Sequence, residues 1–332
     1  MSQTLALPQH MTVRAPNRDE LPTIHALIRA SDLDVFGRTD YTFEELQRDW
    51  SSPDFNPDVD AWVVAQSDGR LVGYAYTASF NHFRHFGMGV THPDYYGQGI
   101  GTALVTLLQT RAREHIPLAP PEARVHLNLG IAGGDERAMQ LLIDHGYEKV
   151  RRFSRMQIVM DAPPPAAVWP EGVTVRTMVA GQDERAIWEA LEEAFADHWG
   201  HSPVDFEQWL ARHQGPGRMI PDLQFLAVEG DTIVGAALCA YMEGFGWVDT
   251  LGVRRPWRKH GVGMALLRHV FGEFYQRGTC EVGLGVDSQS LTGATRLYER
   301  AGMDAIVHYD SYEKELRPGV ELSVQSLDDE GA

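Results

Sequence analysis

Two glycines separated by one residue, Gly261 and Gly263, follow an apolar run that ends at Val253 and precede a segment with helical apolar spacing. Glycine permits positive φ or close backbone approach, so successive amide N–H groups can point at one ligand. The following helix adds unpaired N–H donors and a partial positive charge at its N-terminus. The segment 258–264 therefore predicts a binding site for a diphosphate group.

Two other glycine-rich phosphate sites fit these residues poorly. A dinucleotide site needs Gly-x-Gly-x-x-Gly at the start of a βαβ unit and an acidic residue roughly 20 positions later. Neither feature is present around Gly261. A Walker loop ends in Gly-Lys-Ser/Thr, whereas Gly263 is followed by Met264.

Arg258, Gly261 and Gly263 do match a known pattern. They resemble the Arg/Gln-x-x-Gly-x-Gly/Ala turn of the Gcn5-related N-acetyltransferase (GNAT) family, and residues 298–303, Tyr-Glu-Arg-Ala-Gly-Met, resemble its Tyr-x-x-x-Gly-Phe helix end. The resemblance spans nearly the whole chain and implies acetyl transfer from acetyl-CoA, as co-substrate, to the primary amine of a small molecule. In architecture the chain resembles the tandem members of the family, such as the mycothiol synthases, which leaves an amino-sugar thiol open as the acceptor. A non-catalytic acyl-CoA-binding or interaction protein is the alternative from another class.

The resemblance assigns a cofactor site and a general acid. The turn would hold the diphosphate through its backbone, with Arg258 adding a charge-assisted bond, and the preceding strand would pair with the pantetheine arm and polarise the thioester carbonyl. Tyr298 is the candidate acid, because a phenol with an ordinary pKa of about 10 is protonated at neutral pH; alternatively it only packs at a helix end. The cofactor-binding residues are Leu251, Gly252, Val253, Arg258, Lys259, His260, Gly261, Val262, Gly263 and Met264.

The general base is less well defined by the sequence. Asp249 is preferred, because it lies inside an apolar strand where burial would raise its pKa. Glu243, Asp287 and a water wire remain alternatives. The acceptor is expected near residues 195–201 and the side chains Trp199 and Trp209, which can equally belong to the core.

A second copy of the glycine turn occurs earlier in the chain. Gly99 and Gly101 precede Gly261 and Gly263 by 162 positions, and Gly146 precedes Gly302 by 156. The first copy has Tyr96 in place of Arg258 and Leu142 in place of Tyr298, and Tyr147 is a doubtful substitute for the acid. It therefore predicts weak coenzyme A binding, or none, by Gln98, Gly99, Ile100 and Gly101, and a catalytically degenerate first domain.

The fold class follows from the same repeat. Each half alternates hairpin-like strands with helices, which predicts an α/β layered (α+β) fold, with helices on a mostly antiparallel sheet; the resemblance adds that each sheet is splayed. The predicted strand pairs 147–153 with 154–160 and 303–309 with 310–316 close the two halves. The sequence predicts two tandem GNAT-like domains, at residues 10–161 and 172–318. A Pro-rich linker joins them at 162–171, and a flexible acidic tail follows at 319–332.

Composition limits the function classes. The net charge of −17 argues against nucleic-acid binding and favours a cationic amine. Residues up to 166 carry 15 Lys and Arg against 20 Asp and Glu, and the rest carry 14 against 26. The basic residues Arg254, Arg255, Arg258 and Lys259 within that acidic half predict a polyphosphate ligand.

The remaining expectations concern location and metals. No apolar stretch reaches the roughly 18 residues of a membrane span, and no signal-peptide pattern is present, which predicts a cytoplasmic protein without membrane partners. Cys239 and Cys280 are expected to be buried thiols, and no metal-ligand spacing occurs, so no metal is expected. The sequence leaves monomer and homodimer open.

Overall fold

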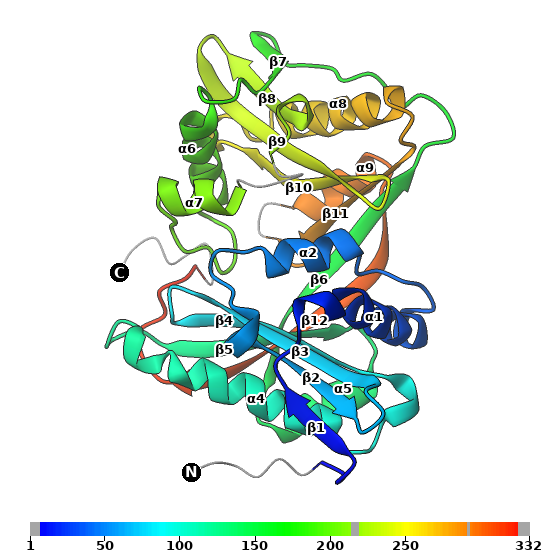
Figure 1. Cartoon of the computed structure of the whole chain (residues 1–332). Coiled ribbons are helices and arrows are strands. Elements are labelled where there is room, and N and C mark those ends of the chain that lie inside the picture. The colour runs from blue at the N-terminus through cyan, green and yellow to red at the C-terminus, as the bar shows by residue number, and fades with distance from the viewer. Residues whose placement is uncertain (1–6, 214–218, 291–292, 325–332) are drawn as a thin grey trace. The chain divides into compact units, whose positions relative to one another are not determined.

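The computed structural model describes residues 7–213, 219–290 and 293–324, and packing divides them into two units. Of these described residues, unit 1 contains those from 7 to 152 and from 307 to 322, and unit 2 contains those from 153 to 306 together with 323 and 324. Each unit is a sheet with helices on both faces, as Figure 1 shows. The predicted layered α/β fold is confirmed.

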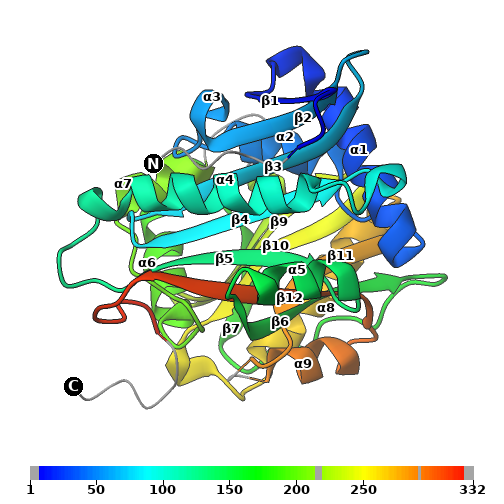
Figure 2. The same cartoon turned by 90° about the horizontal axis from the view of Figure 1, so that it is seen from below.

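The sheet of unit 1 has the order β1-β2-β3-β4-β5-β12, and its pairs are antiparallel except for parallel β4 and β5. Helix α4 covers one face, along β3 and β4 (Figure 2), and α1 and α2 pack on the other. The strands are β1 (Met11–Arg14), β2 (Ala61–Gln66), β3 (Leu71–Phe80), β4 (Arg84–Thr91), β5 (Val125–Ala132) and β12 (Asp304–Arg317). The helices are α1 (Leu21–Phe36), α2 (Phe43–Trp50), α3 (Pro57–Asp60), α4 (Ile100–Glu114) and α5 (Glu136–Asp144).

Two apolar clusters hold the helices of unit 1 to its sheet. Leu104 and Leu108 of α4 pack on Leu127 and Leu129 of β5. On the other face, Ile24, Ile28 and Leu46 pack around Tyr74. Helix α2 begins with a capping box: the Thr42 hydroxyl accepts from the Glu45 N–H, and the Glu45 carboxylate accepts from the Thr42 N–H.

Unit 2 repeats this plan, with the order β6-β11-β10-β9-β8-β7 and parallel pairing between β10 and β11. Helix α8 packs on one face through Val262, Leu266 and Phe271, and α6 packs on the other through Ile187 and Leu191. The strands are β6 (Glu148–Val159), β7 (Val173–Thr177), β8 (Gln224–Glu229), β9 (Thr232–Met242), β10 (Phe245–Val253) and β11 (Glu281–Asp287). The helices are α6 (Glu184–Phe195), α7 (Phe206–His213), α8 (Val262–Gln276) and α9 (Ala294–Arg300).

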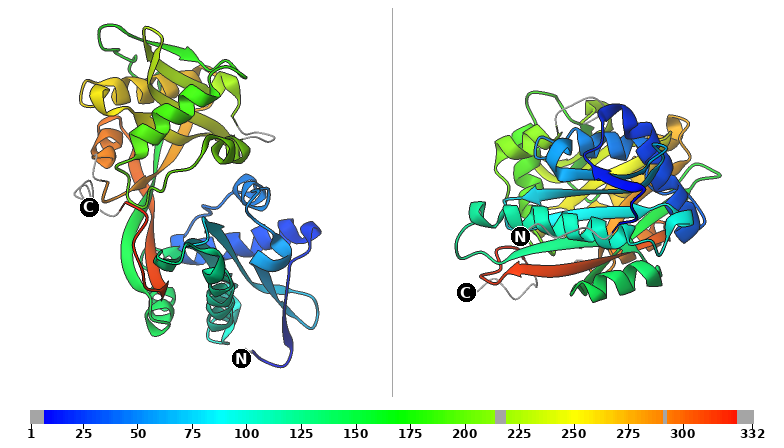
Figure 3. Two further views of the ribbon diagram at one scale, coloured as in Figure 1. Left: turned by 90° about the vertical axis from the view of Figure 1, so that its left-hand side faces the viewer. Right: turned by 60° about the horizontal axis from the view of Figure 1, so that its bottom comes forward.

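The two units exchange their closing strands. Residues 153–159 of β6 pair with β11 in unit 2, although they belong to the first half of the chain. Residues 309–317 of β12 pair with β5 in unit 1, although they belong to the second half. Figure 3 shows β6 and β12 as two long strands, green and red in its left view.

This exchange corrects two expectations. Each of the two predicted strand pairs is a single continuous strand, β6 or β12. The polar residues at the expected turns have other partners, because Asp310 accepts from Arg152 at 2.6 Å and the Ser154 and Ser288 hydroxyls lie 2.7 Å apart. The predicted domains 10–161 and 172–318 mark the two copies in the sequence, whereas the packed units are discontinuous. The Pro-rich segment 162–171 has no helix or strand and lies within unit 2.

Two smaller expectations were wrong in part. Residues 319–324 of the predicted tail are held by hydrogen bonds: the Val320 N–H donates to the Glu122 carbonyl at 2.7 Å, and Arg124 donates to Glu321 at 3.0 Å. Residues 325–332 lie outside the described residues. Cys239 is buried as predicted, but Cys280 is exposed because it ends the turn before β11. Among the described residues, no helix combines the length and the apolarity that a membrane span requires.

Candidate functional site

In unit 2 the predicted cofactor strand separates from its neighbour. β10 pairs with β11 only from Gly246 to Val248 in the ladder, and beyond this point β10 pairs with β9 alone. The register with β9 shifts between Val248 and Thr250, so Asp249 is the extra residue of a β-bulge. The residues Leu251, Gly252 and Val253 therefore lie where the sheet is open toward β11.

The predicted turn leads directly into α8, as the sequence indicated. Gly261 is the residue before the helix and has φ of 94°, which an L-residue adopts only with strain. Gly263 permits a close approach: a Cβ there would lie 3.3 Å from Cδ2 of Leu297 in α9. His260 and Lys259 are exposed, Val262 is buried, and Met264 is half-buried in the first turn of α8. The turn thus brings α9 against the first turn of α8.

The arginines of this turn have protein partners, which changes the interpretation of the basic loop. Arg258 donates to the carbonyl groups of Val253 at 3.1 Å and Ala194 at 2.7 Å, and to the Asp197 carboxylate at 2.5 Å. Arg255 also binds Asp197, and Arg254 binds Glu193 at 2.6 Å. Burial by itself would raise the pKa of Asp197, but its bonds to Arg258 and Arg255 lower that pKa below its ordinary value. These arginines fasten the turn to α6, so their presence is explained without a polyphosphate.

Tyr298 lies on α9 and is 7% exposed, in the same apolar cluster as Val262 and Met303. Burial raises its pKa to about 12, so the phenol is protonated at neutral pH. The packing role considered from the sequence is therefore present. Its proximity to the turn follows from the contact between Gly263 and Leu297, the residue before Tyr298.

The candidate bases differ from expectation. Asp249 is exposed at the bulge, so its predicted burial is wrong, although its place at the opening of the sheet remains. Glu243 is exposed in the β9–β10 turn, with φ of 44°. Asp287 is 3% exposed and accepts from the Gln289 N–H at 2.9 Å.

On the α6 side of unit 2, the two predicted tryptophans are both core residues. Trp199 and Trp209 are each 8% exposed, and Trp209 stacks on His213 at 4.3 Å. Glu192 lies 3.4 Å from His201, and burial raises the pKa of Glu192. This pair was not predicted, because nothing in the sequence spacing connects a residue on α6 with the loop that follows it.

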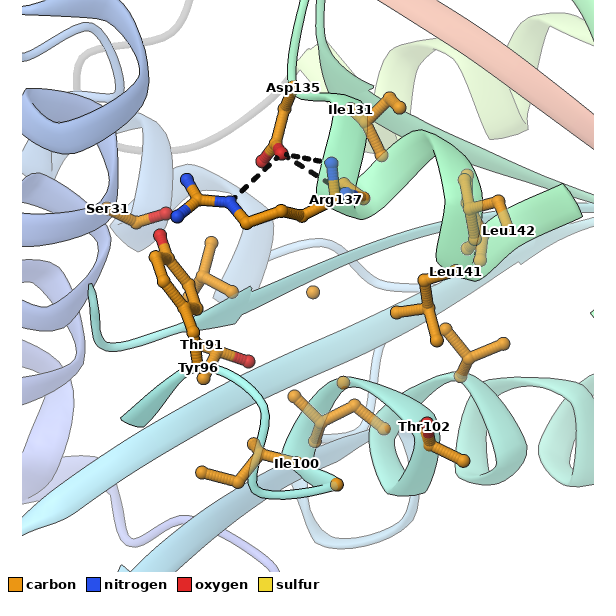
Figure 4. Close-up of a pocket in the computed structure, with 18 of the residues that line it drawn as sticks. Ser31, Thr91, Tyr96, Ile100, Thr102, Ile131, Asp135, Arg137, Leu141 and Leu142 are labelled. Carbon is orange, nitrogen blue, oxygen red and sulfur yellow. Dashed lines mark hydrogen bonds and ion pairs between the residues drawn. The ribbon is translucent and has the colours of Figure 1, made fainter. Parts of the chain in front are cut away.

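Unit 1 contains a cavity of about 580 Å³ at the position of the first glycine turn. Parallel pairing of β4 and β5 ends at Gly87 and Leu129, and the cavity lies where the two strands diverge. Its wall includes the backbone of the turn, the start of α4 and one side of α5 (Figure 4). The lining residues central to this description are Gly89, Val90, Thr91, Gly97, Gly99, Ile100, Gly101, Gly130, Ile131, Leu141 and Leu142.

The glycines of this turn repeat the geometry of unit 2. Gly99 precedes α4 with φ of 81°, and a Cβ at Gly101 would lie 2.8 Å from Cδ2 of Leu141. Ile100 is buried and Gln98 is half-buried. Leu142 occupies the place of Tyr298, as the sequence predicted, and is 2% exposed. Unit 1 therefore keeps the backbone framework of the turn without the phenol.

Tyr96 has the anchoring role that Arg258 has in unit 2. The Tyr96 hydroxyl donates to Asp34 at 3.1 Å, and Asp34 follows Ile24 by ten positions, as Asp197 follows Ile187. Arg137 also donates to Asp34, at 2.8 Å, and its guanidinium lies 4.0 Å from the Tyr96 ring centre, at the cavity (Figure 4). Burial and then Asp34 raise the pKa of Tyr96 to about 12. The missing arginine at position 96 therefore marks a changed anchor.

Known sequences agree with this geometry. The profile described as Acetyltransferase (GNAT) family matches residues 22–127 and 184–303. A mycothiol acetyltransferase of Thermobispora bispora is 33% identical over 250 residues, which cover 73% of this chain and 79% of that protein. One from Streptomyces bingchenggensis is 32% identical over 266 residues, covering 76% of this chain and 79% of its own.

Solved structures agree as well. The GCN5-related N-acetyltransferase from Sphaerobacter thermophilus is 41% identical with a TM-score of 0.85, over 96% of this chain and 100% of that chain. A tandem GNAT protein from the clavulanic acid biosynthesis pathway, 15% identical over 93% of this chain and 100% of its own, has the same fold with a TM-score of 0.67. The chain is an acyltransferase with a coenzyme A-linked co-substrate, and it belongs to the acetyltransferase (GNAT) family as a tandem member.

Proposed function

We propose that the chain transfers an acetyl group from acetyl-CoA to the primary amine of a small molecule, and that unit 2 performs the transfer. The observation that carries this proposal is a combination in unit 2: a bulged, open β10 leads through the Gly261 turn to α8, and α9, which carries Tyr298, packs through Leu297 against that turn. Acetyl-CoA supplies the thioester when it is bound.

The residues of unit 2 are assigned the following roles. The N–H groups at the start of α8 bind the diphosphate, aided by the helix N-terminus. Backbone groups of Leu251, Gly252 and Val253 orient the acyl-bearing arm and polarise its carbonyl. Tyr298 holds the proton that neutralises the leaving thiolate, which its high pKa keeps available at neutral pH. Asp249 at the bulge accepts a proton from the amine, directly or through water.

Unit 1 is proposed to hold coenzyme A as well, more firmly than its sequence suggested. The cavity, the Gly99 turn and the intact anchor between Tyr96 and Asp34 support this. The acid is absent from unit 1, since Leu142 stands in its place. Unit 1 is therefore a cofactor-binding unit of low or no transferase activity.

A second, more specific candidate function concerns the identity of the acceptor. The relatives called mycothiol acetyltransferase, at 33% and 32% identity, favour an amino-sugar thiol over other small amines. The excess of Asp and Glu over Lys and Arg in the second half of the chain favours a cationic amine in either case.

The test is thiol release from acetyl-CoA by the full chain with a panel of primary amines that includes amino sugars. Turnover with at least one amine, lost with its N-acetylated form, is expected. Tight binding of acetyl-CoA without turnover of any amine would favour a non-catalytic acyl-CoA-binding protein. A co-purified cofactor measured by native mass spectrometry would show how many sites are occupied.

A further inference from the structure

Strand β11 has an exposed glycine in the middle of the unit 2 sheet. Gly285 is the first residue of β11 beyond its pairing with β10, and a Cβ built on it would meet nothing within 4 Å. Its neighbours Leu284 and Val286 pack in the α8 cluster, so Gly285 and Gly283 lie on the opposite face, where α6 packs. Inner strands of a layered fold are normally covered on both faces. The exposed glycine therefore marks an opening on the α6 face.

Arg155 reaches over β11 at this opening. It lies on β6, opposite Gly285 in the antiparallel ladder. Its Cζ atom lies 4.7 Å from the ring centre of Trp247, which belongs to β10 on the other side of β11. Strands β6 and β10 are two strand spacings apart, about 10 Å. The two side chains therefore meet above β11, where residues 283 and 285 carry no side chain of their own.

Gly283 determines where the Trp247 ring lies. The two residues are paired in the parallel ladder, and a Cβ at position 283 would lie 3.0 Å from Cζ3 of Trp247. The indole thus lies against the backbone of β11 and carries the Arg155 guanidinium on its ring. Stacking on a ring uses the face of a guanidinium, whereas its five N–H donors lie in its plane. An arginine held in this way can bind an anion in addition to neighbouring protein groups.

This arginine is close to the reacting end of the proposed transferase site. Asp249, the proposed base, is exposed at the bulge of β10, two residues beyond Trp247. Two residues of a strand span roughly 7 Å. An acceptor that brings its amine to Asp249 therefore places a group a few bonds away from that amine within reach of Arg155.

Unit 1 shows that the fold does not require this arrangement. Ser311 of β12 takes the place of Arg155, because it pairs with Gly130 of β5 at the matching position. Asn128 of β5 takes the place of Gly283, because it pairs with β4 at the matching position. The arginine and the glycine that makes room for it thus occur together in the unit to which transfer is assigned.

We propose that the acceptor carries an anionic group close to its primary amine, and that Arg155 binds this group while the amine faces Asp249. A carboxylate and a phosphate both fit the guanidinium fork, so the acceptor is an amino acid or an amino phosphate. The inference rests on the proposed transferase function of unit 2 and adds the class of its acceptor. Because β6 belongs to the first half of the chain, that half supplies a substrate-binding residue to unit 2.

The test is steady-state kinetics of the full chain with acetyl-CoA and pairs of amines that differ only in the anion. Each amino acid of a panel is paired with its carboxamide, and 2-aminoethyl phosphate is paired with ethanolamine. The charged member of at least one pair is expected to have a kcat/KM about tenfold or more above that of its neutral partner. A preference found in the phosphate pair alone identifies the anion as a phosphate.

Arg155→Met removes the charge and keeps an apolar chain over Trp247. It should lower kcat/KM for the charged member of a pair by roughly 10-fold to 100-fold, mainly through KM, and for the neutral member by less than about threefold. Arg185→Met is the matched control, since Arg185 also lies over an aromatic ring of unit 2, 4.1 Å from the ring centre of Phe206, but at the first turn of α6. Its kinetics should equal those of the wild type.

Calorimetric titration of the same pairs, in the presence of coenzyme A, separates this inference from the proposed function. Turnover without preference for the charged members, or equal losses for both members in Arg155→Met, would overturn the inference and leave acetyl transfer standing. Binding of a charged member that Arg155→Met abolishes, without turnover of any amine, would support the anion site and overturn the transferase function. Neither binding nor turnover with any pair would overturn both.

Discussion

The two units share a backbone plan and differ in the side chains around it. In each unit a parallel strand pair separates, and a glycine at positive φ ends the turn that follows. A second glycine lets α5 approach α4 in unit 1 and lets α9 approach α8 in unit 2. Among the described residues, unit 2 has the bulge residue Asp249 and the phenol of Tyr298, whereas unit 1 has no bulge between β3 and β4 and has Leu142 in place of the phenol. The groups that make phosphate binding possible are thus separable from the groups that perform transfer.

The anchors of the two turns show how one contact can be made by different residues. An aspartate near the C-terminal end of equivalent helices, α6 and α1, binds Arg258 in unit 2 and Tyr96 in unit 1. The first is an ion pair and the second a hydrogen bond, supplemented by Arg137. Tyr96 therefore makes the contact that holds the turn, although in the sequence it looks like the loss of a cofactor-binding arginine.

Cutting the chain within 162–171 should have the largest effect on both units. Each fragment, 1–166 or 167–332, lacks the strand that closes its own sheet, so each loses the stability of a domain, about 5–15 kcal/mol. We expect each fragment alone to be unfolded by circular dichroism and the mixture to form a folded 1:1 complex in size-exclusion chromatography. A cooperative melt of either fragment alone would show that the units are independent.

Tyr298→Phe tests the difference in catalysis. Removing the proton donor should lower kcat by about 10²-fold to 10⁴-fold, while the Kd for acetyl-CoA changes less than twofold, because the ring still packs in the core. Steady-state kinetics and calorimetry measure the two quantities. Tyr241→Phe, an exposed site of the same unit, is the control. Unchanged kcat in Tyr298→Phe would leave unit 2 without its acid.

Asp197→Asn tests the anchor of the unit 2 turn. Loss of charged hydrogen bonds to Arg255 and Arg258 should lower the free energy of unfolding by about 2 kcal/mol at pH 7. The pKa of Asp197 is lower in the folded state, so its contribution is present above the unfolded pKa of about 3.9 and is lost as the pH falls through the folded value. Urea unfolding should therefore show the difference between variant and wild type shrinking toward pH 2.

The matched change in unit 1 is Asp34→Asn. Its side chain is 36% exposed, against 11% for Asp197, so the expected loss is below about 1 kcal/mol. Equal losses in the two variants would remove the distinction between the anchors.

Gly99→Ala and Gly261→Ala test whether both turns bind the co-substrate. Positive φ costs an alanine about 1 kcal/mol, and the displaced N–H groups should weaken binding at the altered unit only. Calorimetry with acetyl-CoA should give two sites in the wild type and lose one of them in each variant. Full retention of both sites in Gly99→Ala would show that the unit 1 cavity serves another ligand.

Local patterns predicted much of this molecule because they depend on neighbouring residues. The turn before α8 was predicted from the short spacing of its glycines, and the substitution of Leu142 for Tyr298 was predicted from the repeat of the pattern 156 positions apart. The exchange of β6 and β12 was not, since apolar alternation shows that a strand forms but not which strand it joins. The partners of Arg258 and the exposure of Asp249 depend on a residue 61 positions away and on a one-residue bulge, neither of which spacing reveals.

The strand exchange also fixes when each part of the chain can finish folding. During synthesis, residues 1–152 leave the ribosome first, but the edge of β5 is uncovered until residues 309–317 have been made. An uncovered edge strand can pair with other chains, and translation at about 5–20 residues per second leaves it open for roughly 10–40 s. The edge of β5 is therefore exposed to pairing with other chains until most of the second half of the chain has been made.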